Sequence, residues 1–331
     1  QRDFGIPRFT YDEGLAQLYG QPPMWPTPTR GVSEIRLALR YRSNDSLLRH
    51  FKDTSTLYLE IVDYPGEWLL DLPMLAQDYL SWSRQMTGLL QGQRAEWSAR
   101  WRQLCAGPDP LAPADEARLA DIAAAWTDYL HACKREGLHF IQPGRFVLPG
   151  EMAGAPALQF FPWPDVDAVG EAKLAQADKH SNAGMLRERY KYYCEKVVKG
   201  FYKEHFLRFD RQIVLVDCLQ PLNSGPQAFN DMRLALTQLM QSFHYGQRTL
   251  FRRLFSPVID KLLFAATKAD HVTVDQHSNM VSLLQQLIQD AWQNAAFEGI
   301  SMDCLGLASI QATQSGLIEL NGEKIPALRG N

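Results

Sequence analysis

The sequence predicts an α/β fold, in which a doubly wound and mostly parallel sheet is interrupted by a large, mostly helical insertion. Segments 33–42 and 55–63 alternate apolar and polar residues with the period of a half-buried strand. From residue 67 to about residue 208, apolar and aromatic residues recur at helical spacing. Beyond residue 209, apolar runs of strand length alternate with amphipathic stretches, an order typical of parallel sheets.

The individual elements follow from the same patterns. Residues 1–32 are rich in proline, glycine and aromatic side chains and predict an extended or looped segment. The continuous apolar run of 211–219 predicts a strand that is buried on both faces. Two further strands are expected, at 261–267 and 303–313. Helices are expected at 74–104, 114–135, 185–207, 229–243 and 280–297.

The expected domains follow from this order. An α/β domain is formed by 1–66 together with 209–331, and an inserted helical module is formed by 67–208. The four tryptophans of the module at helical spacing (82, 97, 101 and 126) are expected to be core residues rather than a ligand cage.

Composition excludes several classes of function. The 331 residues include 34 basic and 37 acidic side chains, for a net charge of −3, which argues against a nucleic-acid partner. The apolar runs fall far short of the roughly 20 residues that a membrane-spanning helix needs, so an integral membrane protein is not expected. The five cysteines show no CxxC spacing, which favours a reducing, cytoplasmic location.

The residues that follow the strands are the candidates for chemistry, because parallel α/β sheets bind ligands at the carboxyl ends of their strands. Asp63-Tyr64-Pro65-Gly66 follows the second strand. In such a motif the carboxylate orders a magnesium ion through water, and the glycine lets a backbone N–H approach a γ-phosphate. Taken alone, the motif also fits an ordinary turn.

A second strand end carries Thr267-Lys268-Ala269-Asp270. The Asp270 carboxylate can accept hydrogen bonds from guanine N1–H and the exocyclic amine. Adenine lacks the N1–H donor and would leave the carboxylate unpaired, at about 1–3 kcal/mol. The aliphatic stem of Lys268 can lie over the base plane. The alternative interpretation is a solvated lysine beside a helix-capping aspartate.

The order of these motifs resembles that of Ras-like GTPases, in which DxPG, [NT]KxD and a strand ending in small residues are the third, fourth and fifth signatures. The stretches TPTRGVSEIRLALR, LEIVDYPGEWLLDLPML, HFIQPGRFVLPGEM and LLFAATKADHVT are similar to the YcjX family of bacterial Ras-like P-loop proteins. This resemblance implies a P-loop GTPase fold with a helical insertion after the third motif.

The resemblance also implies an activity and a setting. We expect GTP or GDP as the bound nucleotide, Mg2+ as cofactor, and slow GTP hydrolysis by a molecular switch, with ATP hydrolysis less favoured. The family is associated with a bacterial stress response and a membrane-associated protein partner. The expected location is therefore the cytoplasm, with peripheral attachment at the inner membrane as a further expectation.

Site residues are carried over position by position. Thr27 and Thr29 precede the first strand, where a GTPase supplies a threonine hydroxyl to magnesium, and Thr29 is favoured. Asp63 would reach the same ion through water. Glu67 stands where Ras-like enzymes often place a water-orienting glutamine, so the residue that activates water is unassigned. The expected nucleotide-binding residues are Asp63, Gly66, Thr267, Lys268, Asp270, Ala312 and Thr313.

One departure from the family pattern opens an alternative. The sequence contains no G-x-x-x-x-G-K-[ST] motif, and the first strand with its P-loop is expected upstream of Gln1. Together with Glu67 in place of glutamine, this also fits a non-catalytic interaction scaffold. Such a protein would keep a GTPase-like sheet and bind a membrane-associated partner through residues 67–208.

Overall fold

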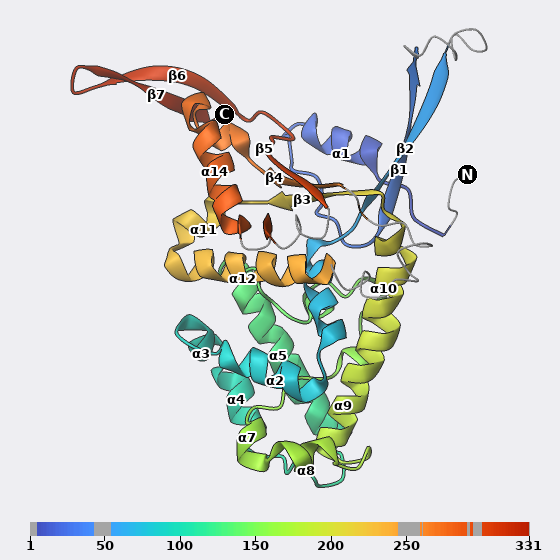
Figure 1. Cartoon of the computed structure of the whole chain (residues 1–331). Helices are drawn as coiled ribbons and strands as arrows, with labels where there is room; N and C mark the ends of the chain where they lie inside the picture. The colour runs from blue at the N-terminus through green and yellow to red at the C-terminus, as the bar shows by residue number, and fades with distance from the viewer. Residues whose placement is uncertain are drawn as a thin grey trace.

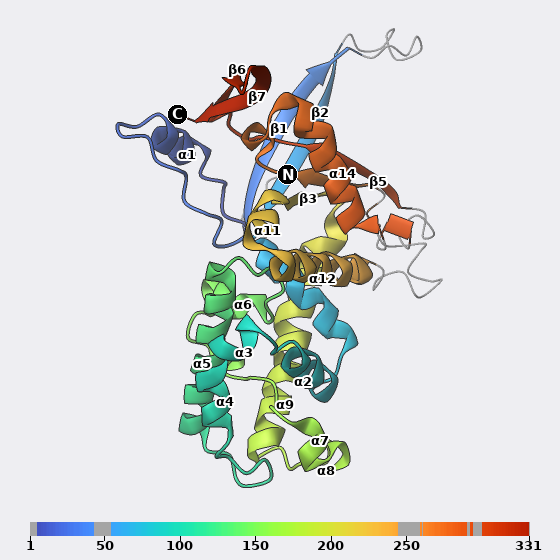
Figure 2. The same ribbon diagram turned by 90° about the vertical axis from the view of Figure 1, so that its left-hand side faces the viewer.

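The computed structural model of the chain describes residues 5–42, 54–243, 259, 261–289, 292–293 and 300–330. Three small sheets lie on one side of the molecule and a body of helices on the other (Figure 1). The long helix α12 (Pro226–Phe243) lies across the boundary between them, as both views show (Figures 1 and 2).

The first sheet is an antiparallel pair, β1 (Ser33–Tyr41) and β2 (Ser55–Asp63). The two predicted strands are confirmed, and the register places Leu37 opposite Leu59 and Leu39 opposite Leu57. The prediction that one face of each strand is buried is wrong, because these four leucines are 40–54% exposed. The segment before β1 was predicted to be extended or looped throughout, which is wrong for one stretch. Helix α1 (Tyr11–Leu18) lies there, and none of its residues is buried.

The second sheet is parallel, with strand order β3 (Arg211–Val216), β4 (Lys261–Ala266) and β5 (Ser301–Gly306). Its strands alternate with helices α12 and α14 (His277–Leu287), which confirms the predicted α/β alternation. The helix expected at 280–297 begins earlier, at residue 277, and residues 290–291 and 294–297 of that expectation lie outside the described residues.

Two details of the predicted sheet are wrong. The strand expected at 211–219 ends at Val216, and it is buried on one face only: Val214 and Val216 face the core, whereas Ile213 and Leu215 are 60% and 62% exposed. The described strands also form three separate sheets rather than the single sheet that was predicted. No described strand pairs with both β2 and β3, so the first sheet is not joined to the parallel sheet by hydrogen bonds. Helix α11 (Leu219–Ser224) begins directly after β3.

The last strand was expected to run from 303 to 313, and the structure divides it in two. Ala266 of β4 and Gly306 of β5 form the last pair of the parallel sheet. Beyond it, Leu307 still bonds to Ala266 and Ala269. Lys268, however, adopts a left-handed conformation (φ 60°) and turns the β4 chain away, so the regular strand pairing ends there. Thr313 instead begins a hairpin of β6 (Thr313–Leu320) and β7 (Glu323–Gly330).

The chain between β2 and β3 contains helices and no strand within the described residues. It opens with a 3-10 helix, η2 (Gly66–Ala76). The single helix expected at 74–104 is wrong, because that stretch is divided among the end of η2 and the three helices α2 (Tyr79–Gly88), α3 (Gln93–Trp97) and α4 (Ala99–Cys105). A π-helical turn (Tyr193–Val198) joins α9 to α10, so that the helix expected at 185–207 is confirmed in three pieces. The other helices are α5 (Glu116–Arg135), α6 (Gly144–Val147), α7 (Val166–Val169), α8 (Glu171–Ala175), α9 (Asn182–Tyr192) and α10 (Lys199–Glu204).

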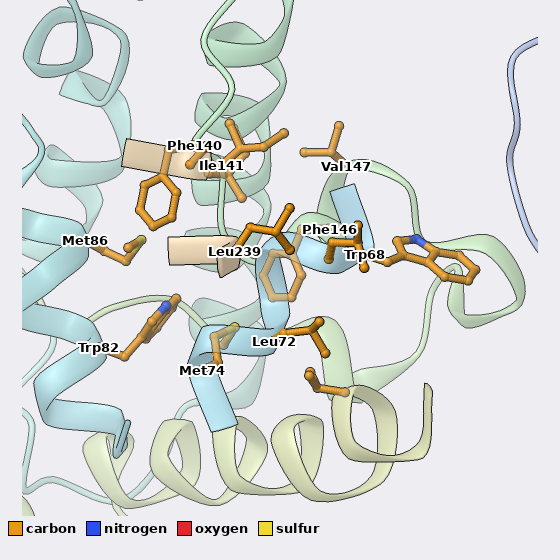
Figure 3. Packing of buried hydrophobic residues seen from close by; sticks show 14 of the residues in the cluster. Trp68, Leu72, Met74, Trp82, Met86, Phe140, Ile141, Phe146, Val147 and Leu239 are labelled. Carbon is orange, nitrogen blue, oxygen red and sulfur yellow. The ribbon is translucent and has the colours of Figure 1, made fainter. Parts of the chain in front are cut away.

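The helical body has an aromatic core that α12 shares. Trp82, Trp101 and Trp126 are fully buried, as predicted for core residues, and Trp97 is partly buried against the same core. Leu239 of α12 and Leu72 of η2 belong to this cluster (Figure 3). This shared packing means that η2 is enclosed between α12 and the helical body rather than exposed at the sheet edge.

A buried ion pair joins the same two parts. Arg94 of α3 donates to Asp231 of α12 at 2.5 Å, and the two side chains are 5% and 7% exposed. Arg94 also donates to the Tyr129 hydroxyl, and Asp231 accepts the backbone N–H groups of His139 and Phe140. Both charges are thus compensated by several hydrogen bonds, which a buried pair requires.

Candidate nucleotide-binding site

The end of β2 brings two predicted site residues together. The hydroxyl of Thr29 donates to Asp63 Oδ2 at 2.6 Å, although the residues are 34 positions apart. Thr27, the other threonine considered, is held elsewhere, since its backbone N–H donates to the Gln17 side chain. Hydroxyl and carboxylate oxygens are ligands that Mg2+ accepts, usually with several waters retained.

The residues present fit magnesium rather than a metal in an all-protein cage. Within the described ranges there is no group of three or more His, Cys, Asp and Glu side chains placed to hold an ion. Thr29 and Asp63 would therefore have to share the ion with water and phosphate oxygens, which is the usual manner of magnesium binding in phosphoryl-transfer proteins.

Gly66 and Glu67 continue from β2 into η2. Gly66 does not adopt a positive φ, and a Cβ added there would meet no heavy atom within 4 Å. The Glu67 carboxylate pairs with Lys134 of α5 at 2.6 Å. Glu67 is thus turned toward the helical body, and the residue in the position of a water-orienting glutamine is already engaged.

The rest of η2 is fixed by the loop around Gly144. Asp71, which is 1% exposed, accepts hydrogen bonds from the N–H groups of Gly144 and Arg145 and from the Tyr193 hydroxyl. The Arg145 guanidinium lies over the Trp68 ring, 3.3 Å from its centroid. A Cβ on Gly144 would overlap the carbonyl oxygen of Glu67, so the loop approaches η2 as closely as glycine permits.

The base-side motif lies at the end of β4. Thr267 extends the sheet by one bond, from its N–H to the Val216 carbonyl at 2.9 Å. Asp270 Oδ2 accepts the N–H of Ala312 at 3.0 Å, and the Thr313 hydroxyl donates to the Asp270 carbonyl. The structure therefore joins Asp270 to both small residues of the 311–313 segment, although that segment is a loop leading into β6 and not the end of β5.

A cavity of about 770 Å³ lies beside Asp270, within the usual size of small-molecule pockets. Its lining includes His277 of α14 and Gly306 at the end of β5. Among the described residues, no hydrogen bond or ion pair joins the Thr29–Asp63 group to the Asp270 group.

The sequence profile of the YcjX-like family (DUF463) matches residues 1–331, the whole chain. This chain belongs to the YcjX-like family. Two curated relatives are both named "Ras-like GTPase YcjX". The protein from Escherichia coli (strain K12) is 91% identical over 331 residues, which cover all of this chain and 71% of that protein. The protein from Shewanella oneidensis (strain MR-1) is 44% identical over 332 residues, covering all of this chain and 68% of the relative.

Two contacts of this YcjX-like chain were not predicted from its sequence. Lys268, expected to lie over a base, forms an ion pair with Asp217 at 2.6 Å. Asp217 directly follows β3, and Asp63 is the last residue of β2. The position at a strand end could therefore have indicated Asp217 as well. Lys134, the partner of Glu67, carries no comparable signal. The helices in the described part of this YcjX-like chain are too short or too polar to cross a membrane.

The buried Asp71 of this YcjX-like chain should make its stability depend on pH. Burial raises the pKa of Asp71 from 3.8 to about 6, and the hydrogen bonds from Tyr193, Gly144 and Arg145 limit that rise. Because the folded state holds the proton more tightly, the contribution is fully present below pH 4 and is lost as pH rises through about 6. We expect the free energy of unfolding to fall by about 1.4 kcal/mol per pH unit in this window relative to Asp71→Asn.

Urea unfolding of both proteins at several pH values between 4 and 7 measures this difference. Tyr193→Phe serves as the control, since it removes one hydrogen bond and keeps the titrating carboxyl. Parallel pH profiles for wild type and Asp71→Asn would contradict the expectation.

Proposed function

We propose that this YcjX-like protein binds guanine nucleotides and hydrolyses GTP slowly, as a molecular switch with a Ras-like fold. The observation that carries the proposal is the arrangement of Asp270, whose carboxylate accepts the Ala312 N–H while Thr313 bonds to its backbone carbonyl. The base-reading carboxylate of the TKxD motif is thus oriented by the segment that follows the next strand. The name of the two relatives, Ras-like GTPase, supports the same reading.

The phosphate end of the nucleotide would lie at the other group. Thr29 would bind Mg2+ through its hydroxyl and Asp63 through water, and their 2.6 Å hydrogen bond supports this pairing. A magnesium ion there would neutralise charge on the phosphates during hydrolysis. The backbone N–H of Gly66 would contact the γ-phosphate, from a position with open space around its Cα.

The proposed switch couples that contact to the helical segment. We propose two domains, an α/β domain of 1–66 and 209–331 and an inserted module of 67–208. The first residues of the module form η2, so a displacement of Gly66 passes directly to Trp68 and Asp71. Both of these side chains are buried against the body of the module.

The slow rate rests on Glu67. Its carboxylate pairs with Lys134 at 2.6 Å, so it is not placed to orient water. The same ion pair favours the second candidate, a non-catalytic scaffold that binds a membrane-associated partner through residues 67–208. For the switch, we propose a cytoplasmic role in a bacterial stress response, with attachment to the inner membrane through such a partner. This setting rests on the family resemblance.

The Gly66→Ala variant distinguishes the two candidate functions, the molecular switch and the non-catalytic scaffold, when it is measured in the full-length protein with Mg2+. Because the added methyl has open space, we expect the free energy of unfolding to change by less than about 0.5 kcal/mol. GDP affinity should stay the same. Affinity for a non-hydrolysable GTP analogue should fall about tenfold, because the alanine methyl would occupy the space through which the γ-phosphate approaches the N–H of residue 66 and would weaken that hydrogen bond. Calorimetric titration measures both affinities.

Limited proteolysis of the same proteins reports on the helical module. Wild type should be cleaved differently in the GDP and GTP-analogue states, and Gly66→Ala should show no such difference. Wild-type protein that turns over no GTP and is cleaved identically in both states would favour the scaffold. A variant that keeps the wild-type difference would show that the switch does not pass through Gly66.

A further inference from the structure

Asp217 and Lys268 meet at the carboxyl edge of the parallel sheet. Asp217 directly follows β3 and Lys268 follows β4 by two residues, and Asp217 Oδ2 lies 2.6 Å from Lys268 Nζ. The Asp217 side chain is 22% exposed and that of Lys268 is 53% exposed. Asp270, whose carboxylate would read the base, lies two residues beyond Lys268 in the chain.

The other oxygen of Asp217 fixes the carboxylate in place. Asp217 Oδ1 accepts the N–H groups of Leu219 and Gln220, at the start of α11. Desolvation raises the pKa of Asp217, but the bond and charge of Lys268 and these two N–H groups outweigh it and bring the pKa below its ordinary value. The carboxylate is therefore ionised at neutral pH and held in one orientation.

Gln220 extends this support into the helical segment. Its side-chain oxygen lies 2.8 Å from His139 Nε2, and its amide nitrogen donates to the Gly137 carbonyl at 3.3 Å. The Asp217 carboxylate is thus bound to the first residues of α11, and α11 is itself bound to the segment that follows α5.

Lys268 occupies an unusual backbone conformation. With φ 60° and ψ 36° it is left-handed, which costs an L-residue with a full side chain about 1–2 kcal/mol. A half-exposed ion pair contributes about 0–1 kcal/mol and does not offset that cost. Strained residues of this kind cluster at ligand-binding sites, where a fixed side-chain direction serves the ligand.

We propose that Asp217 is a positioning residue of the nucleotide site. Its carboxylate holds the Lys268 ammonium, so that the aliphatic stem of Lys268 lies over the plane of the guanine base that Asp270 binds. This inference rests on the proposed function. It adds a second acidic residue on the base side, which acts through Lys268 and does not touch the base.

Asp217→Asn tests the proposal, because asparagine keeps an oxygen for the Leu219 and Gln220 N–H groups and loses only the charge. In the full-length protein with Mg2+, the Kd for GDP and for GTP should each rise about tenfold, with the preference for guanine over adenine nucleotides unchanged. Asp217→Glu should recover most of the affinity. Asp275→Asn, at an exposed carboxylate of the following turn, should bind like wild type.

The coupling is measured with Lys268→Met, which keeps the stem and removes the ammonium. This single variant should lose about as much affinity as Asp217→Asn, and the double variant should lose no more than either. Additive losses, or Asp217→Asn binding within twofold of wild type, would overturn the inference and leave the proposed function intact. If Asp217→Asn does not fold, the test rests on Lys268→Met, which changes a half-exposed side chain. Nucleotide affinity of Lys268→Met equal to that of wild type would then overturn the inference. Wild-type protein that binds neither nucleotide would overturn both.

Discussion

Asp270→Asn is expected to weaken GDP and GTP binding by about a hundredfold or more. Asparagine keeps an oxygen for the Ala312 N–H, so the loop contact survives. The amide would, however, present N–H2 to a guanine edge that carries only donors, and a buried unpaired donor costs about 1–3 kcal/mol on each side of the contact. Calorimetric titration of the full-length protein with each nucleotide measures the loss.

Xanthine nucleotides provide a second test, in which the Asp270→Asn variant should gain affinity rather than lose it. Xanthine has a C2 carbonyl where guanine has an amine, so the asparagine amide gains an acceptor and XDP should bind Asp270→Asn better than GDP does. ATP affinity should be little changed, and Asp275→Asn should bind like wild type. A wild-type preference for ATP, or an Asp270→Asn variant with unchanged GDP affinity, would contradict the base-reading role of Asp270.

Arg94→Ala is expected to lower the free energy of unfolding by about 3–5 kcal/mol, the usual effect of breaking a buried ion pair from one side. The variant leaves the Asp231 carboxylate buried with two backbone N–H donors and no counter-charge. Urea unfolding monitored by tryptophan fluorescence provides the measurement.

The matched control lies in the same helical body. Arg100 and Asp128 form an exposed pair at 3.3 Å, and Arg100→Ala should change the free energy of unfolding by less than about 1 kcal/mol. Equal effects at the buried and the exposed pair would contradict the expected contribution of the Arg94–Asp231 contact to stability.

The fold was predictable where the pattern is local. Apolar residues at period two were sufficient for β1 and β2, and the apolar runs located β3 and β4. The order in which these strands pair within the sheets depends on strands and helices that lie far away in the chain. The exposure of Ile213 and Leu215 shows this, because an apolar run looks the same whether one face of a strand is covered or two.

In the candidate site, too, local sequence patterns indicate some residues, and the packing of distant elements determines the others. Asp63 and Asp270 were predictable because each follows a strand, and their roles in binding nucleotide stay predictions. The burial of Asp71 and its bond to Tyr193, 122 positions away, depend on how the helices pack. The Glu67–Lys134 pair likewise arises from the direction in which η2 leaves the sheet, which no local pattern indicates.

The 3-10 winding of η2 determines the distance between the two ends of this segment. A 3-10 helix rises about 2.0 Å per residue and an α-helix about 1.5 Å, so the eleven residues of η2 extend about 22 Å instead of about 17 Å. One end continues from β2 and the other leads to α2, and Asp71 fastens the middle. Rewinding η2 as an α-helix would draw its ends about 5 Å closer. The distance between the end of β2 and the start of α2 therefore depends on the helical rise of η2.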